Sequence, residues 1–318
     1  MTLVDELAGM LSDPFMQRSL AAAVIVGLTA PVIGTYLVQR RLSLLGDGIG
    51  HVALTGVAVG WLVGSAMGLV ENDALAVPGA VVAAIIGAIA IELVRERGRT
   101  SGDVALALLF YSGIAGGVLI IGFAGGTNAN LMSYLFGSIS TVTMTDLYLT
   151  IGLGVIILAV GVGLSAALFA VSHDEDFARA SGLPVRALNI AIAVIAALTV
   201  TVSMRVVGLL LVSALMIIPV AVAQLVTTSF RRTMAVAVGV GVTVCIVGLS
   251  ITYWQEQSPG ATIVILAVLI YAFVAALRPL VLRRRRAGRD PHPDMLDDVA
   301  LDASPDASLH KGATTCSE

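Results

Sequence analysis

Long apolar runs separated by short polar stretches dominate this sequence. Each run is about 20 residues long, the length of a helix that crosses a bilayer, and none alternates between apolar and polar positions like a membrane β-strand. The pattern predicts an all-α, polytopic membrane helix bundle with nine spans, at roughly 19–38, 44–69, 76–94, 103–123, 145–171, 185–204, 208–226, 233–252 and 261–281. Eight spans are the alternative, because the connection Val206-Val207-Gly208 allows either a tight hairpin or one kinked helix.

Composition changes this picture little and excludes several classes of protein. Mean hydropathy is +0.97, 58% of the residues are hydrophobic and 12% are charged, which excludes an ordinary soluble domain. The net charge of −3 gives no support to nucleic-acid binding. Cys245 and Cys316 imply no disulfide framework. The early acidic residues Asp5, Glu6 and Asp13 argue against a cleaved signal peptide, which needs a basic start.

The arginines are distributed unevenly between the two sides of the membrane. Threading nine spans places most of them on one side: Arg40, Arg41, Arg95, Arg97, Arg99, Arg179, Arg186, Arg231, Arg232 and the four at 283–286. Because positive loops stay in the cytoplasm, we expect the N-terminus outside and the C-terminus inside. The expected parts are an extracytoplasmic stub (1–16), a transmembrane permease domain (17–284) and a disordered, acidic cytoplasmic tail (285–318).

The most distinctive stretch joins the first two spans. Arg40-Arg41 ends one apolar run, and the next run opens with Asp47 and His51. Along a helix these two side chains lie one turn and about 40° apart, on one face. Ionisable groups inside a span normally face a pathway, and a carboxylate with an imidazole suits a borderline divalent metal ion. The pair is the candidate metal site, and two copies of the chain would supply four ligands.

Two other interpretations of Asp47 and His51 stay open. They could form a hydrogen-bonded pair that only fixes the helix bend or pairs with a neighbouring chain, or they could act as a proton relay in a secondary transporter. Asp47 lies about 9 Å along a helix from Arg41, so it could sit nearer the cytoplasmic mouth than the membrane centre. Glu92 lies near the same mouth and is interpreted as a structural partner of Arg95 and of Arg99.

Glycines and prolines in the spans are interpreted as packing or hinge positions. Gly56, Gly60, Gly64 and Gly68 recur every four residues on the helix side opposite Asp47, which predicts close approach of a neighbouring helix. Proline inside a span frees a backbone carbonyl and kinks the helix. The positions selected on these grounds are Pro31, Gly46, Gly56, Gly60, Gly208 and Pro219.

Two connecting segments predict short helices of their own. The outer one, 124–145, contains an expected interfacial or re-entrant helix at 130–138. In the inner one, Ser172 is the expected N-cap, acids fill the first turn, Gly182 ends the helix in the left-handed conformation, and Pro184 begins the next span.

Taken together, several motifs resemble one known family. They are Arg40-Arg41-x-Ser43-Leu44-x-Gly46-Asp47-x-x-x-His51, Gly56-Val57-Ala58, Ser133-Tyr134-Leu135-Phe136-Gly137-Ser138, Ala178-x-x-x-Gly182-Leu183-Pro184, and the run from Val207-Gly208 through Ser213-Ala214-Leu215-Met216 to Pro219. In this order they are similar to the permease subunits of bacterial zinc and manganese ABC importers, over about residues 14 to 282. The N-terminal stub and the acidic tail lie outside the resemblance.

The resemblance implies a function and partners. It implies a homodimeric permease in the bacterial plasma membrane, with two cytoplasmic ABC ATPase subunits and an extracytoplasmic solute-binding protein that delivers Zn²⁺, Mn²⁺ or, in some members, Fe²⁺. It also implies that Asp176, Phe177, Ala178, Gly182 and Pro184 belong to a coupling helix on the ATPase. The chain contains no GxxxxGK[ST] loop, so ATP would be hydrolysed by a partner polypeptide, and no permanently bound cofactor is expected.

Two further classes remain as alternatives. A proton-coupled secondary metal transporter would need intramembrane acids besides Asp47, which stands nearly alone. An intramembrane hydrolase would need a nucleophile or an HExxH motif, and the sequence contains no HExxH. The residues do not distinguish zinc from manganese, because the permeases of both share these motifs.

Overall fold

The structure is a computed structural model that describes residues 9–68, 75–96, 102–123, 134–137, 142–254 and 257–286. All regular structure in these residues is helical, and nine helices are long and apolar enough to cross a membrane. They are α2 (Pro14–Gln39), α3 (Leu45–Ala66), α4 (Ala76–Glu96), α5 (Gly102–Phe123), α7 (Met144–Gly163), α10 (Val185–Val207), α11 (Leu209–Val226), α12 (Phe230–Trp254) and α13 (Pro259–Arg286). Within this part of the chain, the all-α and nine-span predictions are confirmed.

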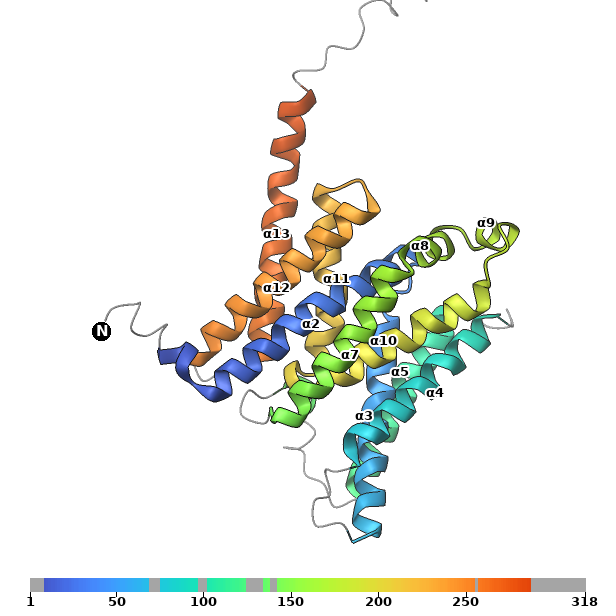
Figure 1. Cartoon of the computed structure of the whole chain (residues 1–318), viewed down its shortest axis with the longest axis vertical. Coiled ribbons are helices and arrows are strands. Elements are labelled where there is room, and N and C mark those ends of the chain that lie inside the picture. The colour runs from blue at the N-terminus through green and yellow to red at the C-terminus, as the bar shows by residue number, and fades with distance from the viewer. Residues whose placement is uncertain are drawn as a thin grey trace, which may run out of the picture. The chain divides into compact units, whose positions relative to one another are not determined.

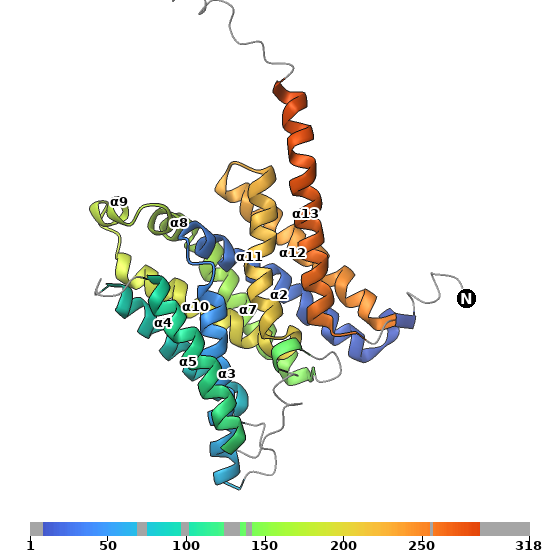
Figure 2. The same cartoon turned by 180° about the vertical axis from the view of Figure 1, so that it is seen from behind.

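The chain divides into two compact units, Met1–Val274 and Ala275–Glu318, and the second contains the last helical residues of α13. In the first unit, α3 packs on α4 and α5, whereas α2 packs on α7, α11 and α12 (Figure 1 and Figure 2). Helix α10 contacts members of both groups. The most buried spans are α2, α10, α3 and α11, so these four helices form the core. The others expose more of their apolar side chains, as lipid contact requires.

Small residues let α3 and α4 approach closely. A side chain at Gly56 would overlap the backbone of Gly79, and one at Gly60 would overlap the backbone carbonyl of Leu75. The predicted row of packing glycines does not extend to Gly68, which has open space around it because α3 ends at Ala66. The close contact is therefore confined to the part of α3 that lies against α4.

Helices α10 and α11 form a tight hairpin rather than one kinked helix. Gly208 alone separates them, with φ +87°, and both neighbouring residues are helical. A second glycine in the left-handed region, Gly137 at φ +73°, lies against it, backbone to backbone. Because a Cβ on either glycine would overlap the other segment, the hairpin end and residues 134–137 are locked together.

The predicted positions of the two prolines inside spans are confirmed, whereas the predicted outer helix can be checked only in part. Pro31 lies inside α2 and Pro219 inside α11, as expected. The interfacial helix predicted at 130–138 lies largely outside the described residues, of which 134–136 are helical. The predicted span 145–171 is divided at Leu164 into α7 and the short helix α8 (Ser165–His173).

The inner connecting helix exists, but its predicted N-cap is wrong. The helix is α9 (Glu175–Ala180), and Ser172 is a buried residue of α8. Asp174 has the extended backbone that an N-cap needs, and its carboxylate accepts hydrogen bonds from the backbone N–H groups of Asp176 and Phe177 at 3.0 and 2.9 Å. At the other end, Gly182 has φ +79°, which confirms the predicted left-handed end. Pro184, also as predicted, immediately precedes the next span, α10.

Candidate metal site

Asp47 and His51 lie one turn apart in the first two turns of α3, as their spacing predicts. The Nε2 atom of His51 is 3.8 Å from Oδ1 of Asp47, which is longer than a hydrogen bond. The histidine side chain is 8% exposed and the aspartate side chain 24%. The pair therefore has one buried member and one that opens toward the surface of the chain.

The imidazole of His51 is held by α5. The ring of Phe110 meets it edge-on, with the ring centroids 4.5 Å apart. Nδ1 of His51 is buried and has no hydrogen-bond partner among the described residues. An unsatisfied buried nitrogen costs about 1–3 kcal/mol. Nε2, the nitrogen that lies nearest Asp47, is the atom that could share a metal ion with that carboxylate.

Close contact between α3 and α5 fixes the position of the His51 ring relative to α5. Gly113 on α5 lies against the backbone of His51, where an added Cβ would be 2.6 Å from the carbonyl carbon. One turn further along α3, the hydroxyl of Thr55 donates a hydrogen bond to the carbonyl oxygen of Gly113 at 2.6 Å. The imidazole is thus positioned by two packed helices rather than by a loop.

The opposite face of α3 is packed against α11 and α10. Gly46 faces the sulfur of Met216, and a side chain at Gly50 would overlap Leu209. Pro219 of α11 lies one turn beyond Met216 and is buried. These contacts leave the Asp47 side of α3 as the side with access to a neighbouring molecule or to solvent.

One chain offers too few ligands to enclose a metal ion. The described residues contain no group of three or more histidine, cysteine, aspartate or glutamate side chains that could hold one. Four ligands are usual for zinc, and six or more for harder divalent ions. A metal ion held by Asp47 and His51 would therefore need further ligands from elsewhere.

The turn before Asp47 is short and hydrogen-bonded. Arg40 caps α2, and Arg41 follows in the left-handed conformation with φ +58°. The N–H of Leu42 donates to the carbonyl of Leu37 at 2.8 Å, and the N–H of Arg41 donates to that of Val38 at 3.1 Å. This is a Schellman motif with arginine at the position where glycine is usual. It joins α2 directly to the turn of α3 that carries Asp47.

Beside this turn lies a cluster of four charged side chains. Nη2 of Arg40 is 3.5 Å from Oε1 of Glu92 and 3.1 Å from Oε1 of Glu175, and Nη1 of Arg95 is 2.9 Å from Oε2 of Glu92. The side chains of Arg40 and Glu92 are each 3% exposed. The structural role predicted for Glu92 with Arg95 is thus supported by their ion pair, whereas Arg99 lies outside the described residues.

Burial lowers the pKa of the Arg40 guanidinium. The carboxylates of Glu92 and Glu175 oppose this effect, and the nearby charge of Arg95 adds to it. Arginine stays protonated under all ordinary conditions. The cluster therefore holds two positive and two negative charges, and its neutrality depends on both glutamates.

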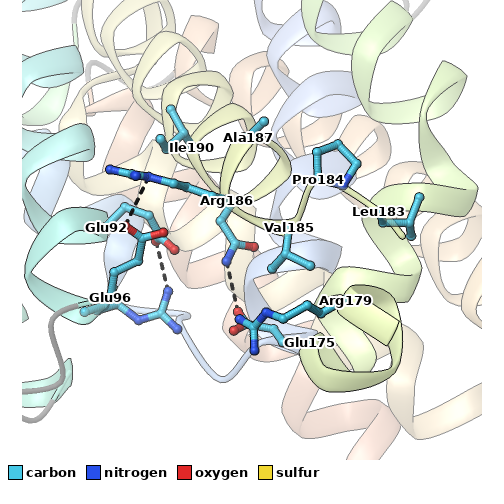
Figure 3. A pocket seen from close by; sticks show the side chains of 12 residues that line it. Glu92, Glu96, Glu175, Arg179, Leu183, Pro184, Val185, Arg186, Ala187 and Ile190 are labelled. Carbon is cyan, nitrogen blue, oxygen red and sulfur yellow. Dashed lines mark hydrogen bonds and ion pairs between the residues drawn. The ribbon is translucent and has the colours of Figure 1, made fainter. Parts of the chain in front are cut away.

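The same end of the chain contains a cavity of about 920 Å³ between α4, α9 and α10. Figure 3 shows Glu92 and Glu96 of α4 on one side of the cavity and Glu175 and Arg179 of α9 on the other. Arg186 crosses toward α4 and pairs with Glu96 at 3.2 Å. The two acidic residues of α4 are therefore paired with basic residues rather than free to bind a metal ion.

Helix α9 presents an exposed apolar side chain. Phe177 is 64% exposed, and Ala178 is completely buried against the rest of the chain. Asp176 and Arg179 form an ion pair at 3.2 Å on the outer face, where both are exposed. This combination of an anchored inner face and a protruding phenyl ring is typical of a helix that docks on another protein.

Comparison with known proteins places the chain in a family. The ABC 3 transport family matches residues 12–278. The chain belongs to this family. It is therefore the multi-pass membrane permease subunit of a metal-ion ABC importer. Its partners are a separate ATPase polypeptide and a binding protein.

Individual relatives of this ABC 3 permease agree over most of their length. The manganese transport system membrane protein MntC of Halalkalibacterium halodurans is 30% identical over 85% of this chain and 89% of the relative. The chelated iron transport system membrane protein YfeD of Yersinia pestis is 31% identical, over 83% and 85% of the two chains. Among solved structures, PsaBC from Streptococcus pneumoniae in complex with Fab superimposes with a TM-score of 0.74 at 30% identity, covering 86% of this chain and 95% of that one.

Sequence reasoning about the ABC 3 permease missed the contacts around Arg40. In the sequence, Glu175 is one of the acids in the first turn of the inner connecting helix, and Arg40 is one of the arginines that indicate the cytoplasmic side. They are 135 residues apart, and no local pattern connects them. The one available signal was that both lie where spans end on the arginine-rich side.

Proposed function

We propose that two copies of this permease import a divalent transition-metal ion, with Mn²⁺ as the first candidate and Zn²⁺ or Fe²⁺ as the others, along a path lined by Asp47 and His51. One observation carries the proposal: Nε2 of the buried His51 imidazole lies 3.8 Å from the carboxylate of Asp47, which is partly exposed. Carboxylate oxygen and imidazole nitrogen suit all three ions. Relatives named for manganese and for iron support this range.

The incomplete ligand set supports a dimer. Each chain contributes one carboxylate and one imidazole, so two copies related by a two-fold axis would provide four ligands. An isologous interface brings the same residues of both subunits together near the axis. A four-ligand site at an interface that can open would bind the ion during passage and then release it, as transport requires.

The distance within the pair argues against the simplest structural role. At 3.8 Å, His51 and Asp47 do not share a hydrogen bond that would fix the helix. The first turn of α3 is also stabilised without them, by packing of Leu45 and Ile49 in the core. A proton relay would need a second intramembrane acid or histidine within reach, and the described residues near Asp47 offer only His51.

The expected orientation follows from the arginines. Arg40, Arg95, Arg179 and Arg186 lie together at the end of the bundle that carries α9, and positive residues remain in the cytoplasm. With this end inside, the N-terminus is outside, and α9 faces the cytoplasmic ATPase. The protruding Phe177 and neighbouring Asp176 would then contact the ATPase, while Ala178 anchors the helix on the permease, Gly182 ends it and Pro184 leads into α10.

Uptake by the assembled transporter tests the proposal. The permease, its ATPase and its binding protein would be reconstituted in proteoliposomes, and ATP-dependent entry of Mn²⁺, Zn²⁺ and Fe²⁺ measured. We expect Asp47→Asn and His51→Gln each to lower uptake by at least about tenfold. His173→Gln is the matched control, because that histidine bonds Gln39 at the end of α8 instead of facing Asp47. Normal uptake by the double variant would refute the proposal.

A further inference from the structure

We propose that the Arg40–Glu175 contact is the link through which movement of α9 shifts the turn between α2 and α3, and with it Asp47. This inference rests on the proposed function of Asp47 in the metal path. It assigns Arg40 and Glu175 a positioning role and no contact with the ion. The structure supports it by three features: the connectivity of the contact, the alternative partner of Arg40, and the space around α9.

Glu175 ties three elements together through one carboxylate oxygen. Its Oε1 accepts a hydrogen bond from Nη2 of Arg40 at 3.1 Å and another from Nδ2 of Asn189 at 3.1 Å. Glu175 is the first residue of α9, Arg40 caps α2, and Asn189 lies in the first turns of α10. A displacement of α9 therefore acts directly on the end of α2.

Arg40 has a second acceptor that stays in place when α9 moves. The same Nη2 atom is 3.5 Å from Glu92 of α4, which is itself held by Arg95. Nη1 of Arg40 is buried and has no hydrogen-bond partner among the described residues. The guanidinium is thus shared between a carboxylate on a membrane helix and a carboxylate on α9. The guanidinium would therefore keep one carboxylate partner, Glu92, when α9 is displaced.

Removing Glu175 from the cluster changes its charge. With both glutamates present, the cluster is neutral; with α9 displaced, it holds Arg40, Arg95 and only Glu92. A net positive charge at a buried position is unfavourable, so the guanidinium would be drawn toward Glu92. This shift of the guanidinium toward Glu92 acts on Arg40, the residue that caps α2 and whose side chain is buried.

The turn transmits that movement because it is short and internally bonded. Arg41 and Leu42 donate hydrogen bonds back into α2, and Leu42 is buried. Leu45 begins α3 and is also buried, and Asp47 is the third residue of that helix. Because Leu42 and Leu45 pack in the core on either side of the exposed Leu44, a shift of Arg40 is passed on to the first turn of α3.

Helix α9 has room to move. The 920 Å³ cavity lies between Glu175 and the acidic residues of α4 (Figure 3). The side chain of Glu175 is 39% exposed, in contrast to the buried Arg40. A second ion pair across the same cavity, Arg186–Glu96, joins α10 to α4 without involving α9. It provides a matched control.

The test compares metal transported with ATP hydrolysed by the complete transporter in proteoliposomes. Glu175→Gln removes the charge at a half-exposed position and keeps the size of the side chain. We expect it to lower the ratio of Mn²⁺ imported to ATP hydrolysed by at least about threefold while ATP hydrolysis continues. Glu175→Asp should give an intermediate ratio, because it keeps the charge on a shorter side chain. Arg186→Gln should leave the ratio unchanged.

Three results would overturn the proposal. One is an unchanged ratio in Glu175→Gln, and another is an equal fall in Arg186→Gln. The third is a proportional loss of import and ATP hydrolysis, which would indicate weakened docking alone. Thermal unfolding of each complex checks that the variant is folded. Arg40→Lys, which keeps the charge but loses the second arm of the guanidinium, is an independent variant, and we expect the same fall in the ratio of Mn²⁺ imported to ATP hydrolysed. Failure of the proposed function would be distinct, because the double variant of Asp47 and His51 would then import the metal ion normally.

Discussion

Gly113 of α5 lies against the backbone of His51, so close that the smallest side chain would be 2.6 Å from its carbonyl carbon. The neighbouring backbone atoms, N of Val52 and O of His51, would be 2.7 and 2.9 Å away. None of these backbone atoms can yield like the end of a flexible side chain. The position of the imidazole therefore depends on the absence of a side chain on a different helix.

The first prediction concerns this contact. Gly113→Ala should destabilise the permease by about 1–3 kcal/mol, because α5 must move away from α3. Thermal unfolding in detergent measures the change. Gly122→Ala on the same helix is the control: its Cβ would meet nothing within 4 Å, so its stability should stay the same or rise slightly. Equal stability of the two variants would contradict the packing described here.

The second prediction separates backbone strain from overlap. Gly208 and Gly182 both have left-handed φ values, +87° and +79°. Gly182→Ala should lower stability by about 1–2 kcal/mol, the cost of the left-handed backbone alone, because its Cβ would meet nothing within 4 Å. Gly208→Ala should cost at least about 3 kcal/mol, because its Cβ would also overlap the backbone of Phe136 and Gly137. Chemical or thermal denaturation of both variants decides the point, and similar losses would show that the hairpin end is not tightly packed.

The third prediction is a stabilising change. Arg41 is exposed and has φ +58°, a conformation that glycine adopts without strain. Arg41→Gly should therefore raise stability by up to about 1 kcal/mol, as measured by thermal unfolding. A loss of stability would mean that the arginine side chain contributes more than its backbone conformation costs.

Much of the fold could be predicted from the sequence, because membrane helices are specified by local composition. The nine spans, the positions of Pro31 and Pro219, and the left-handed Gly182 all follow from runs and single residues. Ser172 was mistaken for an N-cap because Asp174 offers a better acceptor two residues later, and only the backbone conformation decides between them.

The candidate site was predicted in part for the same reason. Asp47 and His51 share a helical face by their spacing alone. In contrast, the environment of His51 depends on Phe110 and Gly113, and the partner of Arg40 is Glu175, far along the chain. Contacts of this kind arise from how the helices pack, and a single sequence contains no periodic signal for them.

The fourth prediction concerns pH and follows from ligand chemistry. A protonated imidazole has no lone pair for a metal ion, and a protonated carboxyl is a poor ligand, so protons compete with the ion at His51 and Asp47. Import by the reconstituted transporter should fall as the pH is lowered from about 7.5 to about 5.5. ATP hydrolysis measured in parallel shows whether the ATPase remains active at the lower pH. Import that is independent of pH while ATP hydrolysis continues would argue against metal ligation by these residues.

Equilibrium binding of Mn²⁺ to the detergent-solubilised permease–ATPase complex tests the central claim most directly, because it reports on the shared site without requiring turnover. If Asp47 and His51 of two copies form one site, the complex should bind one ion per two permease chains, and Asp47→Asn should abolish that binding while His173→Gln preserves it. One ion per single chain, or binding that survives Asp47→Asn, would contradict a path lined jointly by the two half-sites.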